Sequence, residues 1–218
     1  MAYNLKDHTD IVQYCELEII PKYSEFDGGH KECHVRSVIK KCNDISLWLH
    51  YEQKIETNLS MVYVIAVYHD IGLYGGRKDH GIRSAEYLRN DKNLRRWFNE
   101  EEINIMAEAV EDHRASNKHE PRSIYGKIVS DGDRKIDLTD YISRCISYTI
   151  MMNPDWGKEE IYPEVRNHLV EKYGRGGYLR LYLNYPEDSN QLEGIYERLS
   201  CELTFRSDFE KVWSTVAA

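Results

Sequence analysis

Apolar residues recur with helical spacing along most of this sequence. The strongest signal is a run of eight largely apolar residues, Met61–Tyr68, which is typical of a core helix. Elsewhere, apolar residues three or four positions apart mark single helical faces, as at Ile103, Met106 and Val110. One segment differs, because the alternating leucines of 178–185 are typical of an extended chain. The pattern therefore predicts an all-α fold that includes one short extended segment.

Capping residues predict where several of these helices begin. Asn58 is placed to cap the apolar run, and Asp79 to cap the helix that follows the glycine-rich segment 72–78. Three consecutive acids at 100–102 suit a helix start, because negative charge is favourable at that end of the helix dipole. Pro121 is suited to the first turn of the next helix. These signals divide the chain into a series of helices joined by polar loops.

Histidines and aspartates stand at positions of these helices where an apolar residue is expected. A buried carboxylate is costly unless it is hydrogen-bonded, paired or bound to a metal. A single buried histidine is more often an ordinary core residue than a ligand, but a whole series on successive helices is hard to explain separately. The series indicates a metal site, and its members are His34, His69, Asp70, His80, His113 and Asp131.

The composition limits the class of protein. The chain has 218 residues and a formal net charge of −8, which argues against broad binding to nucleic-acid backbones, since that needs clustered Lys and Arg. Five cysteines, an odd number without a CxxC pair, indicate reduced thiols in a reducing compartment. The N-terminal residues lack a signal-peptide pattern, and no apolar run approaches the roughly 20 residues of a membrane span. We therefore expect a cytoplasmic protein with no nucleic-acid or membrane partner.

The order of these residues resembles the HD-domain superfamily of metal-dependent phosphohydrolases, over roughly residues 27–140. The segments that carry the resemblance are Gly29–Val38, Tyr68-His69-Asp70-Ile71-Gly72, Asp79-His80-Gly81, Glu111-Asp112-His113 and Val129–Arg134. The opening HxxxH-x-R-x-V and the closing DxDR are most similar to small bacterial HD hydrolases that act on nucleotides. In the closing segment Gly132 replaces the usual alanine, which leaves the assignment of Asp131 intact and weakens one for Asp133.

The resemblance implies an HD-type helical bundle within one domain, residues 1–218. Its metal-binding core would span about 27–140, and residues 141–218 would form a mostly helical C-terminal extension. The implied metal ligands are His34, His69, Asp70 and Asp131, with His80 and His113 beside them. One or two divalent ions are expected per chain, and the mixture of imidazole and carboxylate is compatible with Mn, Fe, Ni, Zn or Mg.

His80 and His113 have two alternative roles in this interpretation. They could hold a second metal bridged by Asp70, or they could bind phosphate and move protons beside a single metal. Asp70, His80 and His113 are therefore the expected catalytic residues. The expected substrate-binding residues are His30, Arg77 and Lys78.

The implied function is metal-dependent hydrolysis of a nucleotide or a related small phosphorylated metabolite. Metal-activated water would attack phosphorus, and the bond cleaved could be a monoester or a pyrophosphate. Two alternatives belong to other classes: a di-iron oxygenase on the same scaffold, and a nucleotide-sensing module that retains the metal without turnover. The sequence leaves the exact substrate and the oligomeric state open.

Overall fold

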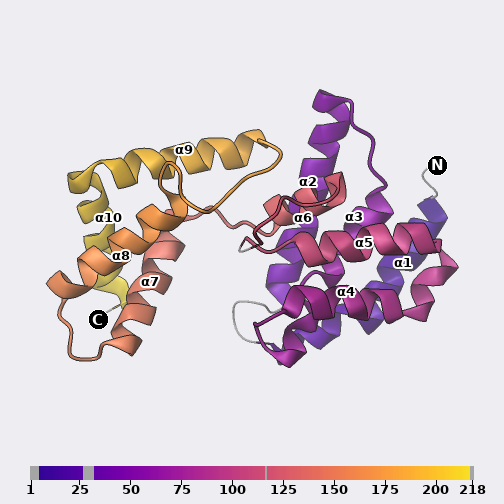
Figure 1. The fold of residues 1–218 in the computed structure, drawn as a ribbon, viewed down its shortest axis with the longest axis horizontal. Helices are drawn as coiled ribbons and strands as arrows, with labels where there is room; N and C mark the ends of the chain where they lie inside the picture. Colours follow the sequence, from indigo (N-terminus) through magenta and orange to yellow (C-terminus); the bar gives the residue numbers. More distant parts are fainter. Residues whose placement is uncertain (1–4, 27–31, 116, 217–218) are drawn as a thin grey trace. The chain divides into compact units, whose positions relative to one another are not determined.

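The computed structural model describes residues 5–26, 32–115 and 117–216, and it confirms the all-α fold (Figure 1). Across those ranges the chain forms α-helices and short 3₁₀ helices and no strand. The elements are α1 (Leu5–Glu18), η1 (Ile20–Glu25), α2 (Glu32–Gln53), α3 (Leu59–Tyr68), η2 (Ile71–Gly75), α4 (His80–Asn90), η3 (Lys92–Arg96), α5 (Glu100–Asp112), α6 (Ile124–Gly132), α7 (Leu138–Met152), α8 (Lys158–Tyr173), α9 (Pro186–Ser200) and α10 (Glu202–Val216). None of these helices is both long enough and apolar enough to cross a membrane.

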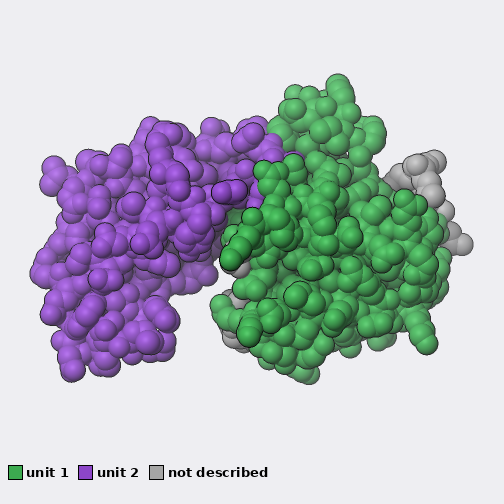
Figure 2. Space-filling model, in the orientation of Figure 1, with its two compact units in different colours: residues 1–134 green, residues 135–218 purple. Residues whose placement is uncertain are grey.

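The chain divides into two compact units, residues 1–134 and 135–218 (Figure 2). The first unit contains α1 to α6, and the second contains α7 to α10. The division falls slightly before the end expected for the metal-binding core, at about residue 140. Residues ahead of 27 also belong to the first unit, so this unit is larger than the segment that carries the sequence resemblance.

Helix α3 is the apolar centre of the first unit. It packs against α1, α2, α5 and α6, which requires a helix that is apolar on all its faces. Asn58 caps it as predicted, because its side-chain oxygen accepts hydrogen bonds from the backbone N–H groups of Ser60 and Met61 at 3.0 and 3.4 Å. The helix ends at Tyr68, so His69 and Asp70 lie at the buried end of an apolar helix.

Helices α2 and α6 approach each other at Gly132. A Cβ atom at this position would lie 2.4 Å from the Sγ atom of Cys42, a distance too short for two packed atoms. Glycine is therefore the residue that allows the two helices to pack this closely. The contact matters for the site, because α2 carries His34 and the chain leaves α6 at Asp133.

We expect Gly132→Ala to lower the free energy of unfolding by about 1–3 kcal/mol, because the added methyl group overpacks a buried contact. Urea denaturation followed by circular dichroism measures the change. In a Cys42→Ala background the obstructing sulfur is absent, so the same substitution should be neutral or slightly stabilising, as alanine is the better helix former. An equal cost of Gly132→Ala in both backgrounds would disprove the steric explanation.

Helix α6 begins later than Pro121 predicts. Its N-cap is Ser123, whose hydroxyl accepts a hydrogen bond from the Gly126 N–H at 3.2 Å. The backbone N–H of Arg122 instead donates to the buried carboxylate of Asp112 at 2.7 Å, which holds this residue outside the helix. Pro121 consequently precedes the helix. At α4 the predicted cap Asp79 is in the N-cap position, but its φ of 56° is left-handed and its side chain makes no cap hydrogen bond.

The segment 178–185 is an irregular connection and not the extended element that its leucines predict. The backbone N–H groups of Tyr178 and Leu179 donate to the carbonyls of Glu171 and Lys172 at 3.1 and 3.0 Å. These bonds close the C-terminal end of α8. A strand also needs a neighbouring strand to bond with, and the described part of the chain contains none.

The second unit has its own hydrophobic core. Helix α7 packs against α8 and α10, and α9 packs against α8 and α10. Phe205 and Phe209 of α10 are fully buried, and the Tyr162 ring of α8 lies 5.8 and 5.0 Å from their centroids. A separate core of this kind is the usual property of a structural domain.

Candidate metal centre

Three buried or half-buried histidines of the first unit have the same local geometry. The Nδ1 atom of each faces the backbone carbonyl oxygen three residues earlier: His69 to Ala66 at 2.8 Å, His80 to Arg77 at 2.9 Å and His113 to Val110 at 2.6 Å. A carbonyl oxygen only accepts hydrogen bonds, so each Nδ1 carries the proton. In the neutral ring, Nε2 then presents a lone pair, which is the form that binds a metal.

Asp70 lies between two pairs of imidazoles. Its Oδ2 atom is 3.7 Å from the Nε2 of His34 and 3.4 Å from the Nε2 of His69. Its Oδ1 atom is 3.0 Å from the Nε2 of His80 and 3.4 Å from the Nε2 of His113. Within each pair the two Nε2 atoms are 3.2 and 3.1 Å apart, respectively. Asp70 therefore belongs to two groups of ligand atoms, each of which could hold a metal ion.

A second carboxylate, that of Asp133, approaches the first of these groups. Its Oδ1 atom is 3.2 Å from the Nε2 of His34 and 3.7 Å from the Nε2 of His69. Asp133 is the C-cap residue of α6. The predicted ligand Asp131 is buried on α6, and neither it nor Asp133 is a member of the two groups. The Asp133 carboxylate is therefore a second candidate ligand beside the first group, and the assignment of Asp131 stays a prediction.

The carboxylates stabilise positive charge on the first histidine pair. Burial alone would lower the pKa of His34, but hydrogen bonds and charges from Asp133 and Asp70 outweigh burial and raise this pKa to about 10. Burial also opposes charge on His69, yet Asp70 and Asp133 raise its pKa as well. For Asp70 the cost of burial is overcome by the charge of His69 and by hydrogen bonds, so its pKa falls well below the usual range. The two carboxylates therefore create a negative potential that favours positive charge at this group.

Side chains behind His113 fix its backbone. Its carbonyl oxygen accepts hydrogen bonds from the Ser130 hydroxyl at 3.2 Å and from Nη1 of Arg134 at 3.1 Å. The neighbouring Asp112 is buried and accepts from the Arg122 side chain, with Arg122 Nη2 at 2.8 Å from Asp112 Oδ1. Sequence reasoning missed these supporting residues, because their partners lie far away in the chain.

The segment that carries Arg77 and Lys78 is tied to α4. Arg83 donates from Nε to the Gly72 carbonyl at 2.9 Å and also bonds the Gly76 carbonyl. Gly72 cannot carry a side chain, because a Cβ atom there would lie 2.4 Å from the His80 carbonyl oxygen. Arg77 and Lys78 are exposed, and the Arg77 carbonyl orients His80. The third predicted substrate-binding residue, His30, lies outside the described residues.

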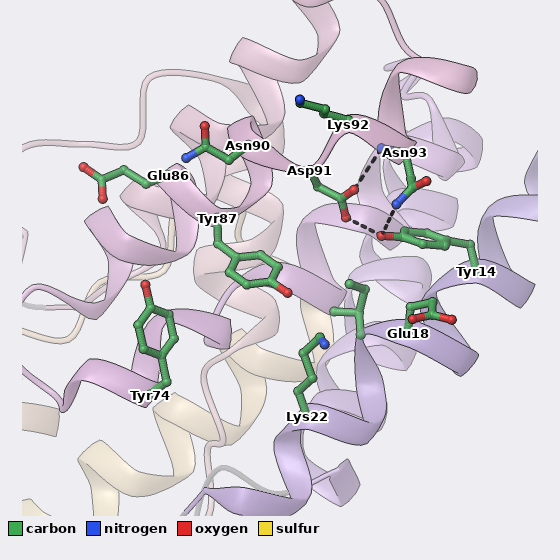
Figure 3. A pocket seen from close by; sticks show the side chains of 11 residues that line it. Tyr14, Glu18, Lys22, Tyr74, Glu86, Tyr87, Asn90, Asp91, Lys92 and Asn93 are labelled. Atoms are coloured by element: carbon green, nitrogen blue, oxygen red, sulfur yellow. Dashed lines mark hydrogen bonds between the residues drawn. The ribbon is translucent and has the colours of Figure 1, made fainter.

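A separate hollow of the first unit is shown in Figure 3. It has a volume of about 520 Å³, and residues from α1, η1, η2, α4 and η3 line it. At its edge the carboxylate of Asp91 accepts hydrogen bonds from the phenols of Tyr14 and Tyr68 at 2.5 and 2.6 Å. Because Tyr68 directly precedes His69, this network anchors the end of the helix that presents the His–Asp pair. No histidine of the two groups lines the hollow.

Comparison with known proteins bears on the family of the chain. No curated protein matches the chain in sequence. A crystal structure described as a predicted HD superfamily hydrolase, from an uncultured Thermotogales bacterium, is similar with a TM-score of 0.44 and 21% sequence identity, and the alignment covers 77% of this chain and 87% of that chain. The family model of the HD domain matches residues 32–144, just over half of the sequence. The chain therefore belongs to the HD-domain family.

Proposed function

We propose that this protein is a metal-dependent phosphohydrolase that acts on a nucleotide or a related small phosphorylated metabolite. Membership of the HD family and the two groups of ligand atoms support a metal-dependent hydrolase in general. The single observation that carries the proposal is the arrangement of His80, His113 and Asp70. In this group both imidazoles face a backbone carbonyl with Nδ1, which fixes the tautomer of each ring.

In this group three acceptor atoms face one another. Both histidines use Nδ1–H to bond a backbone carbonyl, so in the neutral rings Nε2 has no proton to donate. The two Nε2 atoms and Oδ1 of Asp70 nevertheless lie 3.0–3.4 Å apart. Such an arrangement is repulsive unless a positive charge lies among the three atoms. Ligands at about 2.0–2.2 Å from one metal ion lie about 3.0–3.5 Å from each other, which is the spacing found here.

The donor set defines the kind of ion and its chemistry. Imidazole and carboxylate suit Mn, Fe, Ni, Zn or Mg. The first group would hold an ion through His34, His69, Asp70 and Asp133, and the second through Asp70, His80 and His113. A bound divalent ion lowers the pKa of water and polarises a phosphoryl oxygen.

The protein's own groups would position the substrate and move protons. In hydrolysis, the water oxygen forms a bond to phosphorus, the bond from phosphorus to the leaving oxygen breaks, and that oxygen gains a proton. The His80 side chain is 12% exposed and that of His113 only 2%, so His80 is the better placed to exchange a proton with the leaving group or solvent. Arg77 and Lys78 on the adjoining exposed segment would neutralise phosphate charge.

The proposal of a small substrate follows from charge. A net charge of −8 disfavours a long polyanion, which binds through many backbone phosphates. Two cations beside the site are sufficient for one or a few phosphate groups. We therefore expect nucleotides and small phosphorylated metabolites to be cleaved and nucleic acids to be poor substrates.

The metal content of the purified protein, followed by assays with that metal, tests the proposal. We expect one or two divalent ions per chain, release of phosphate or pyrophosphate from at least one nucleotide, and loss of this activity with a chelator. His80→Ala should reduce the maximum metal content by one if the second group binds an ion. Absence of turnover across a broad panel of phosphorylated compounds with each common divalent metal would refute the hydrolase. Consumption of oxygen by an iron-loaded sample would support the di-iron oxygenase instead.

A further inference from the structure

A second cavity lies within the C-terminal unit, between α7 and α8. Its volume is about 590 Å³, which is within the range of small-molecule sites. All the residues that line it belong to α7, α8 and the short connection between them. It is therefore formed wholly by the second unit and contains none of the histidines and aspartates of the metal centre.

The cavity is a groove that follows the two helices. The α7 residues that line it recur at one-turn intervals, from Tyr141 through Arg144 and Tyr148 to Met152, and so share one face of the helix. The rise along this face is about 16 Å. Helix α8 returns alongside α7 after the connection at 153–157, so the C-terminal end of α8 lies next to the start of α7 (Figure 1).

One end of the groove is cationic. The rings of Tyr141 and Tyr173 stack there, with centroids 4.2 Å apart. The Nζ atom of Lys172 lies over both rings, 5.2 and 4.9 Å from their centroids, and the guanidinium carbon of Arg144 lies 5.2 Å from the Tyr141 centroid. Cation–π contacts hold both charges at the groove, and Arg144 also pairs with Asp140, with Nη2 at 3.1 Å from Oδ2.

The same end contains a buried hydroxyl group, that of Tyr173. The residue is only 1% exposed, and burial together with the neighbouring Tyr141 hydroxyl raises its pKa, so the phenol keeps its proton. It can donate a hydrogen bond to an anionic oxygen that also meets Lys172.

The other end of the groove exposes large apolar side chains. Tyr148 is 61%, Met152 57% and Trp156 39% exposed. Flat aromatic rings and a thioether at the mouth of a cavity are suited to stack on a planar ring. The groove thus offers ring-binding surfaces at one end and positive charge at the other, a few helical turns away.

We propose that this groove binds a small organic anion that contains a planar aromatic ring, of the class to which nucleoside phosphates belong. The ring would stack against Tyr148 and Trp156, and the anionic group would meet Lys172, Arg144 and the Tyr173 hydroxyl. The site is separate from the metal centre and does not depend on the hydrolase function.

Binding of the four ribonucleoside 5′-monophosphates to the full chain, measured by calorimetry with a chelator present, tests this proposal. At least one should bind with Kd below about 1 mM. Lys172→Gln and Trp156→Ala should each raise the Kd for that nucleotide by about tenfold, which corresponds to the loss of one good contact. Lys211→Gln removes an exposed lysine outside the groove and should leave the Kd for the nucleotide unchanged. Asp70→Asn should also leave this Kd unchanged, because the chelator keeps metal out of the metal centre. Trp156 is exposed, so its variant remains informative if Lys172→Gln is unstable.

Further ligands distinguish the two ends of the site. Inorganic phosphate lacks the ring and adenosine lacks the anion, so each should bind at least about tenfold more weakly than the nucleotide. Tighter binding of dodecanoate, an aliphatic anion, would overturn the proposal of an aromatic ligand. Nucleotide binding that is lost in Asp70→Asn but kept in Lys172→Gln and Trp156→Ala would assign the ligand to the metal centre. Absence of binding by all four nucleotides would also overturn the proposal.

Discussion

Replacing Asp70 with asparagine should remove bound metal from both groups and lower hydrolytic activity by more than about a hundredfold. The reason is that Asp70 is the member common to both, with one oxygen facing each histidine pair. An asparagine side chain has nearly the same shape but carries no charge, so helical content should be largely retained. Metal analysis after gel filtration, together with far-UV circular dichroism, measures both effects.

Asp79→Asn is the matched control for this change. Asp79 is exposed, lies only nine positions further along the chain, and makes no side-chain cap hydrogen bond. Its replacement should leave metal content and activity within about twofold of the wild type, because it removes the same charge outside the site. Full metal occupancy in the folded Asp70→Asn protein would show that the Asp70 carboxylate is not a metal ligand common to both groups.

Local patterns predicted most of the helical framework. The apolar run forms α3, Asn58 is its N-cap, and the acids at 100–102 form the first turn of α5. These features were predictable because the signals act within one or two helical turns. The same periodicity predicted that His113 is buried, since it continues the buried face of α5. Features that depend on distant partners were not predictable in this way. The start of α6 is set by the bond from Arg122 to Asp112, ten residues earlier.

The C-terminal unit shows the same limit. The alternating leucines at 178–185 indicated an extended segment, but alternation specifies a strand only where another strand lies alongside. The groove between α7 and α8 also lacks a local signature. Its charged and aromatic ends come from residues as far apart as Arg144 and Lys172, which only the packing of the two helices brings together.

Whether Asp131 or Asp133 is the metal ligand can be tested. Asp131 continues the apolar face of Ile128 by helical spacing, and this argument assigned it to the site. Helix α6 ends at Gly132, however, so helical spacing from Ile128 cannot place the next carboxylate, Asp133. Asp133 brings its carboxylate to His34 and His69. Burial would raise the pKa of Asp133, but the hydrogen bond from His34 and the charge of His69 lower it, so the group is ionised at neutral pH.

We therefore expect Asp133→Asn to weaken metal binding at the first group by about ten- to a hundredfold. Asp131→Asn should leave metal affinity near that of the wild type and act on the fold instead, lowering the free energy of unfolding by about 1–3 kcal/mol because Asp131 is buried. Titration of metal against a competing chelator measures the first quantity, and urea denaturation of the metal-free proteins measures the second. The opposite result, with metal affinity lost in Asp131→Asn and kept in Asp133→Asn, would restore Asp131 as the ligand and show that the Asp133 carboxylate only balances the charge of the histidines.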